Sequence, residues 1–288
     1  MAKNKLKNIS KVLFRIAVSA LALYVVFRKV DFNETKNIFL HAYPLWLLWA
    51  LVAFNLSKII SSFRLNIFFE QAGLVLERLY NLRLYYVGMF YNLFLPGGIG
   101  GDGYKIYLLN KFCKTPVRHL ISATLLDRIS GMVSLSFLAF ALALTLKIPI
   151  DGVWPYIILG SLVIITYPAF YLVFKILFKK FIPSFTGTNI YSLFVQGFQL
   201  VSAYCILKSL GVHELYIEYL VLFLVSSVVA VLPFTIGGVG ARELVFILGS
   251  NYFFIDRNTA IAFSLMFFMI TAISSFIGIF LETKIKDL

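Results

Sequence analysis

The stretch Leu95–Lys105, LPGGIGGDGYK, returns 137 positions later as Leu232–Arg242, LPFTIGGVGAR. Seven of the eleven positions agree when lysine and arginine count as equal. In each copy a proline precedes a run of glycines and a cation ends the motif. Proline ends a helix, and glycine lets the chain turn without side-chain clashes. Each copy therefore predicts a break within a long apolar segment.

The composition around these motifs is that of a membrane protein. Of the 288 residues, 60% are hydrophobic and only 14% are charged, and the mean hydropathy is +0.89. Soluble domains carry about a quarter charged residues, and about 20 apolar residues are enough to cross a bilayer. We predict an all-α integral membrane protein in which 1–288 forms a single membrane domain. No segment outside the spans is long enough for a soluble catalytic domain.

Eight apolar segments follow one another along the chain. They are 12–27, 44–63, 84–113, 120–146, 153–178, 190–210, 215–250 and 259–281. The glycine motifs lie in 84–113 and 215–250, which we expect to be re-entrant or broken helical hairpins. The other six segments are predicted to be full spans.

The distribution of the cations predicts the orientation. The net charge of +13 would suggest nucleic acid as a partner of a soluble protein, but in a membrane protein it is typical of cytoplasmic loops. If both motif segments re-enter, seventeen of the 26 Lys and Arg residues fall on the side of both termini and six on the other. We therefore expect cytoplasmic termini in the plasma (inner) membrane and no nucleic-acid partner.

The two halves of the chain have the same predicted order. Both 1–147 and 148–288 read span, span, hairpin, span, but the first half begins inside and the second outside. This predicts an inverted 3+3 repeat whose hairpins enter from opposite faces, as in many secondary transporters. A duplication kept only for packing is the alternative. Irregular backbone at bilayer depth must be sheltered by protein or line a watery cavity.

The end of each motif has the elements of an anion site. A new helix is expected to begin near Tyr104 and near Ala241, and its first N–H groups carry the positive end of the helix dipole. Lys105 and Arg242 lie at these helix starts. Exposed N–H groups beside a cation favour phosphate. The predicted phosphate-binding residues are Lys105, Arg242, Gly98, Gly100, Gly101, Gly237 and Gly238.

Two acids adjoin these cations, Asp102 and Glu243. They are candidate helix caps or counter-ions, because acids are favoured in a first turn. A role in substrate selection or proton transfer stays open for both.

Further ionisable residues lie inside apolar segments. Asp127 is about 10 Å from Leu120 at 1.5 Å per residue, so Asp127 and Arg128 either form an ion pair that locks the fold or line a polar path. Arg64 and Lys58 lie near the end of the second predicted span. Their simplest interpretation is snorkelling to the cytoplasmic interface, although Arg64 is also a candidate supporting residue of the site. We expect no metal and no cofactor.

Four stretches together resemble a known family. They are FRLNIFF (63–69), NLFLPGGIGGDGYKIY (92–107), LLDRISG (125–131) and LPFTIGGVGARE (232–243). They are similar to the membrane domain of the lysyl-phosphatidylglycerol synthase/flippase family, which also occurs as stand-alone flippase-like proteins. In two-domain members a cytosolic domain transfers an aminoacyl group from tRNA, and the membrane domain moves the aminoacylated lipid. This chain ends at Leu288, just after its last span, so we expect that catalytic domain to be absent.

The resemblance and the motifs lead to three hypotheses. The first is translocation of an anionic or aminoacylated phospholipid, or of a polyprenyl-phosphate lipid, with its head group between the two hairpins. The alternative is a non-catalytic accessory subunit that presents lipid to a glycosyl- or aminoacyl-transferase. The third is an enzyme with Asp102 or Asp127 as general base, which we do not expect because no nucleophile or metal group accompanies them. A membrane lipid is the expected partner. A lipid-modifying enzyme and a second copy of the chain are further candidates.

Overall fold

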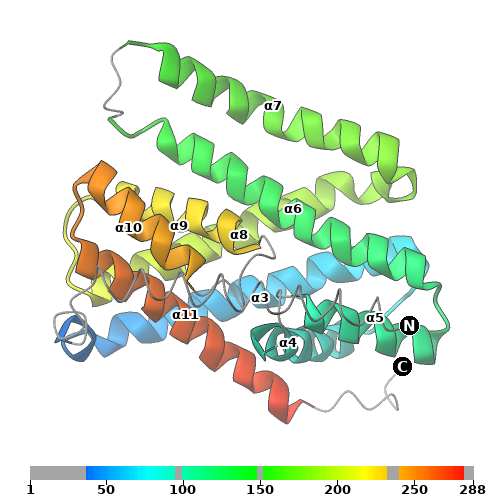
Figure 1. The fold of residues 1–288 in the computed structure, drawn as a ribbon. Helices are drawn as coiled ribbons and strands as arrows, with labels where there is room; N and C mark the ends of the chain where they lie inside the picture. Colours follow the sequence, from blue (N-terminus) through cyan, green and yellow to red (C-terminus); the bar gives the residue numbers. More distant parts are fainter. Residues whose placement is uncertain (1–36, 95–98, 148–151, 232–239, 282–288) are drawn as a thin grey trace, which may run out of the picture.

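A computed structural model of the chain describes residues 37–94, 99–147, 152–231 and 240–281 (Figure 1). The regular elements in this part of the chain are all helices. They are α3 (Pro44–Ala72), α4 (Arg78–Phe94), α5 (Gly100–Cys113), α6 (Val117–Ala143), α7 (Trp154–Leu177), η1 (Lys179–Ser184), α8 (Phe185–Ser209), α9 (Tyr216–Val231), α10 (Ala241–Phe253) and α11 (Arg257–Phe280).

Five helical stretches in the described residues are long and apolar enough to cross a bilayer. They are Pro44–Ala72, Val117–Ala143, Trp154–Leu177, Lys179–Ser209 and Arg257–Phe280. At 1.5 Å per residue even the shortest is about 36 Å long, more than the ~30 Å hydrocarbon core. They match five of the six predicted spans. The remaining one, 12–27, lies outside the described residues. The chain is an integral membrane protein.

The two glycine segments each contain a pair of shorter helices. α4 and α5 take the place of a continuous 84–113, and α9 and α10 take the place of 215–250. The longest of the four has 17 described residues, about 25 Å, so its described part is shorter than the ~30 Å hydrocarbon core. The helices of each pair pack against each other. The prediction of broken helices is therefore correct for the described parts of both segments.

A long antiparallel pair, α3 and α8, forms the centre of the bundle. Near one end Ser202 Oγ donates to the Ala50 carbonyl at 2.8 Å, and towards the other Arg64 Nη1 donates to Ser192 Oγ at 2.8 Å. From the first contact to the second, the residue number increases along α3 and decreases along α8, so the two helices run in opposite directions. α7 lies at the edge of the bundle, where it packs on α6 and η1 (Figure 1).

Helices from the two halves of the chain also pack across each other. α4 lies against α11, and α6 lies against α9. The first contact is so close that a Cβ on Gly278 of α11 would stand 2.4 Å from the Tyr86 carbonyl oxygen of α4. Only glycine allows two helix backbones to approach in this way.

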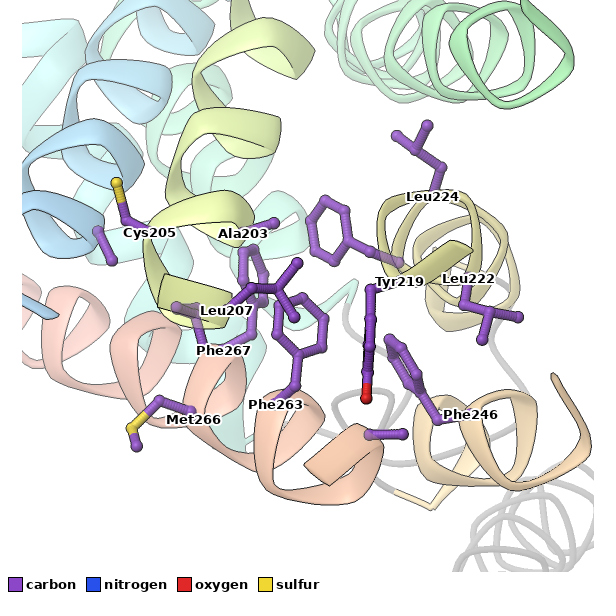
Figure 2. Packing of buried hydrophobic residues seen from close by; sticks show 14 of the residues in the cluster. Ala203, Cys205, Leu207, Tyr219, Leu222, Leu224, Phe246, Phe263, Met266 and Phe267 are labelled. Carbon is purple, nitrogen blue, oxygen red and sulfur yellow. The ribbon is translucent and has the colours of Figure 1, made fainter. Parts of the chain in front are cut away.

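Most of the described buried hydrophobic residues form two clusters, one towards each end of the long helices. The first joins the N-terminal part of α3 to α8, α9, α10 and α11, and Phe263 and Phe267 lie within it (Figure 2). The second joins the C-terminal part of α3 to α4, α5, the start of α6 and the end of α7. On α3 the first cluster reaches Phe54 and the second begins at Leu65. Most of the polar residues of α3, from Asn55 to Arg64, lie between them.

Candidate functional site

A cavity of about 350 Å³ with several charged side chains in its wall lies between the two hydrophobic clusters, within the size range of small-molecule sites. Side chains from α3, α4, α5, α6, α8, α9, α10 and α11 line it, so both halves of the chain contribute. Its charged residues are Lys58, Arg64, Asp102, Lys105, Asp127, Arg128 and Arg242.

The cavity lies near the middle of the long helices. Lys58 is the central residue of α3, about 21 Å from either end. Asp127 is ten residues into α6, near its centre at Ser130. The expectation that Lys58 and Arg64 snorkel from a helix end is wrong, because α3 continues past Arg64 to Ala72 and both side chains line the cavity.

An ion pair joins α3 to α6 on the cavity wall. Arg64 Nε donates to Asp127 Oδ1 at 2.7 Å, and the Arg64 and Asp127 residues are only 4% and 8% exposed. Arg64 Nη1 also donates to Ser192 of α8, so one guanidinium links three helices. Asp127 thus pairs with a residue 63 positions away. The two hypotheses for Asp127 are not exclusive, since this ion pair locks helices together and also lines the cavity.

A second charged cluster joins α5 to α6. Asp102 accepts from Lys105 Nζ at 2.8 Å through Oδ1 and from Arg128 Nε at 2.5 Å through Oδ2. Asp102 is therefore a counter-ion to two cations, as one of the sequence hypotheses proposed. Lys105 is only 4% exposed, and its side chain lies against Gly88, where a Cβ would stand 3.0 Å from Lys105 Cε.

The first motif differs from the prediction in where its helix begins. α5 begins at Gly100 and not near Tyr104, so Asp102 lies in its first turn and Lys105 lies farther along. Gly101 N–H donates to Asn92 Oδ1 at 2.8 Å, which removes one of the donors expected for an anion. A Cβ on Gly101 would stand 1.8 Å from the Gly88 carbonyl oxygen. This glycine permits close contact of α4 and α5. Gly98 lies outside the described residues.

The second motif begins its helix at Ala241, as predicted. Gly240, with φ of 84°, takes a left-handed conformation that suits glycine. The Glu243 carboxylate accepts from Gly240 N–H at 2.7 Å and from Ser264 Oγ at 2.8 Å. Glu243 is therefore a helix cap that also holds α11, and it is not among the described residues that line the cavity. Gly237 and Gly238 lie outside the described residues.

Arg242 and Lys58 rest on aromatic rings. The Arg242 guanidinium carbon lies 4.9 Å from the Phe267 ring centroid, and its Nη2 donates to Ser227 Oγ at 3.2 Å. Lys58 Nζ lies 4.5 Å from the Phe54 centroid, and the Phe54 and Phe267 centroids are 5.6 Å apart. Among the described residues no carboxylate lies within 4 Å of either cation.

Sequence reasoning left Lys58 out of the site. The signal that could have placed it there is the spacing of Lys58, Ser61 and Arg64, which puts three polar side chains on one face of α3. Gln196 of α8 also lines the cavity, and its Nε2 donates to the Gly131 carbonyl of α6 at 3.3 Å. Asn92 and Ser227 also line the cavity and were not predicted.

The fold and the cavity define a class of protein. It is a polytopic α-helical membrane protein with a cavity among its helices. Five cations and two carboxylates line this cavity, so the described wall is net positive. Such a wall can hold an anion near the middle of the long helices.

The family follows from a comparison of the sequence with known families. The family described as "Lysylphosphatidylglycerol synthase TM region" matches residues 12–278, which is nearly the whole chain. The protein belongs to this family, a membrane domain associated with lipid synthesis or flipping. A search of curated proteins found no match.

Proposed function

We propose that the protein carries lipid head groups across the membrane through the cavity, while the lipid tails remain in the bilayer. The observation that carries this proposal is that charged side chains from both halves of the chain converge on one cavity near the middle of the spans. Ionisable residues at this depth are costly and are typical of transport paths. Membership of a lipid-associated membrane family supports a lipid as the cargo.

The packing of the helices supports an inverted repeat of 1–147 and 148–288. If α3, α4 and α6 correspond to α8, α9 and α11, a twofold operation would pair α3 with α8 and turn the α4–α11 contact into an α9–α6 contact. All three contacts are present. α4 follows the C-terminal end of α3 and α9 that of the antiparallel α8, so the hairpins begin at opposite ends of the bundle (Figure 1).

Such a repeat would allow the cavity to open alternately to the two faces by rocking of one half against the other. Six spans, with 12–27 as the first, would place both termini in the cytoplasm. The cations at the end of α5, the start of α6 and the end of α7 support this orientation, since they would then lie on the cytoplasmic side of a plasma membrane.

The ion pairs of the cavity favour transport over catalysis. A general base must be free to accept a proton from its substrate. Both oxygens of Asp102 accept from cations, and Asp127 Oδ1 accepts from Arg64. We therefore propose a role that is not enzymatic for the cavity.

Reconstitution tests this function. Vesicles of phosphatidylcholine with a trace of fluorescent phosphatidylglycerol are treated with an impermeant quencher, and protein that flips lipid should expose the inner-leaflet label. Gly131 lines the cavity, and a Cβ added there would have the Arg64 guanidinium as its nearest contact. Gly131→Leu should therefore fill part of the cavity and slow flipping. Gly160→Leu on α7 is the matched control, because nothing lies within 4 Å of a Cβ there.

The results separate the candidate functions. Flipping by wild type and Gly160→Leu, but not by Gly131→Leu, supports transport. Wild-type vesicles that behave like empty ones refute it, and retention of lipid without flipping would favour presentation to a partner enzyme. Wild-type flipping by a folded Gly131→Leu variant would mean that the lipid does not pass through this cavity.

A further inference from the structure

We infer that the cavity selects lipids with a net negative head group, and that Lys58 and Arg242 form its phosphate subsite. This inference rests on the proposed function, because it assumes that a lipid head group is the ligand. It replaces the predicted pair of Lys105 and Arg242 with a different pair. It also separates this chain from the cationic lipid in its family's description, because each carboxylate of the described wall already contacts a cation.

Most of the charges on the wall already have a partner. Arg64 is paired with Asp127, and both Lys105 and Arg128 contact Asp102. Glu243 is not available to these cations either, because its two oxygens accept from Gly240 N–H and Ser264 Oγ, which do not line the cavity. Among the described charges of the wall, Lys58 and Arg242 are left without a carboxylate in contact.

Lys58 and Arg242 both lie against aromatic rings. They lie above the neighbouring Phe54 and Phe267 rings, which belong to the core behind the cavity. An aromatic ring attracts a cation, but it does not cancel the charge. Two like charges in one cavity at bilayer depth repel each other and are poorly solvated. An anion between them would relieve both costs.

The donors of Lys58, Arg242 and Ser227 suit a phosphate. A planar guanidinium binds phosphate through two parallel hydrogen bonds, and an ammonium group binds it as a point charge. Ser227 already accepts from Arg242 and has a hydroxyl hydrogen of its own that can donate. Together these three side chains provide donors around one oxyanion. A phosphate ester of a lipid is the ligand class that fits them.

An aminoacylated head group would fit this wall poorly. Its ammonium groups would need acceptors, preferably carboxylates. Both oxygens of Asp102 hold cations, and Asp127 contacts Arg64. An added ammonium would instead meet the positive field of Lys58 and Arg242. Such like-charge contact discriminates against a ligand as effectively as a favourable contact selects one.

Competitive lipid binding tests the inference without requiring transport. The purified full chain is incubated with equal amounts of phosphatidic acid, phosphatidylglycerol and lysyl-phosphatidylglycerol of matched tails, and retained lipid is measured by native mass spectrometry. We expect the two anionic lipids to be retained at least about tenfold more than the lysyl lipid, the effect of one charge-assisted hydrogen bond.

Variants then locate the subsite. Lys58→Gln and Arg242→Gln should each lower retention of phosphatidylglycerol by about tenfold. Lys58→Arg keeps the charge and should retain most of the binding. Lys111→Gln removes an exposed lysine near the end of α5 and should have no effect.

Each outcome decides the matter. Equal or greater retention of the lysyl lipid by the wild type overturns the selectivity, and this readout needs no variant to fold. An anionic preference that survives both glutamine variants overturns the assignment to Lys58 and Arg242, as does an equal loss in Lys111→Gln. Selective binding without flipping in vesicles would refute the proposed function alone. Flipping with a preference for the lysyl lipid would refute this inference alone.

Discussion

Gly101→Ala should separate the two helices of the first hairpin. A Cβ at this position would stand 1.8 Å from the Gly88 carbonyl oxygen and 2.5 Å from its carbon, well inside the 3.0 Å that real Cβ contacts respect. The obstructing atoms are backbone, so no side-chain rotation relieves the clash. α4 and α5 would have to move apart by more than 1 Å where they cross.

The expected cost follows from two opposing effects. Overpacking a closely packed site costs about 1–3 kcal/mol, and a backbone clash belongs at the upper end. Replacing a helical glycine by alanine stabilises the helix by up to about 1 kcal/mol, because alanine has the higher helix propensity. We expect a net loss of about 2 kcal/mol in the free energy of unfolding, which is more than a tenfold change in the unfolding equilibrium.

Gly103→Ala is the matched control in the same helix. Nothing lies within 4 Å of a Cβ at Gly103, so only the propensity effect remains and the variant should gain about 0.5–1 kcal/mol. The free energies of unfolding of the two variants should therefore differ by about 3 kcal/mol, with Gly101→Ala less stable and Gly103→Ala more stable than the wild type. Unfolding by sodium dodecyl sulfate in mixed micelles, followed by circular dichroism, measures both.

The comparison also has a functional part. Moving α5 away from α4 shifts Asp102, the next residue, relative to Arg128 of α6. Gly101→Ala should therefore slow lipid flipping, and Gly103→Ala should not. If the two alanine variants unfolded within about 0.5 kcal/mol of each other, the scatter of ordinary surface substitutions, the proposed close contact at Gly101 would be refuted.

Three further changes test the remaining contacts by the same unfolding assay. Asp127→Asn leaves the buried Arg64 without its counter-charge and should lower the free energy of unfolding by about 3–5 kcal/mol. The double variant Arg64→Met with Asp127→Leu removes both charges and should recover most of this stability. A double variant as unstable as Asp127→Asn would contradict the explanation. Glu243→Ala leaves two buried donors unpaired and should cost about 2 kcal/mol or more, whereas a loss below about 0.5 kcal/mol, within surface-substitution scatter, would mean that the cap is dispensable. Gly278→Ala should destabilise the contact of α11 with α4 by about 1–3 kcal/mol. Gly160→Ala on α7 should not be destabilising, because nothing lies within 4 Å of a Cβ there. Equal free energies of unfolding for the two variants would refute the close approach of α11 to α4.

The sequence predicted the long helices and the breaks well, because these depend on local composition. Apolar length located the five described spans, and the second glycine motif located the start of α10 at Ala241. The convergence of Lys105 and Arg242 on one cavity followed from treating the two motifs as equivalent. Their expected joint role in holding phosphate stays a prediction.

The choice of partners could not be predicted, because it depends on how helices far apart in the chain pack. Asp127 pairs with Arg64 although Arg128 is its neighbour in sequence, since adjacent residues on a helix point in different directions. The start of α5 was placed too late for a related reason. The glycines were interpreted as a turn, but Gly101 is helical and its missing side chain serves the contact with α4.

The crossed packing of the two halves has a consequence for how the chain is made. A ribosome delivers α4 and α6 to the bilayer before α9 and α11, the helices on which they pack, have been synthesised. Until then the nascent half would expose the charged faces of its helices to lipid or to an insertion chaperone. Assembly should therefore be completed late in translation, and a ribosome that stops early would leave a fragment for membrane proteases to remove.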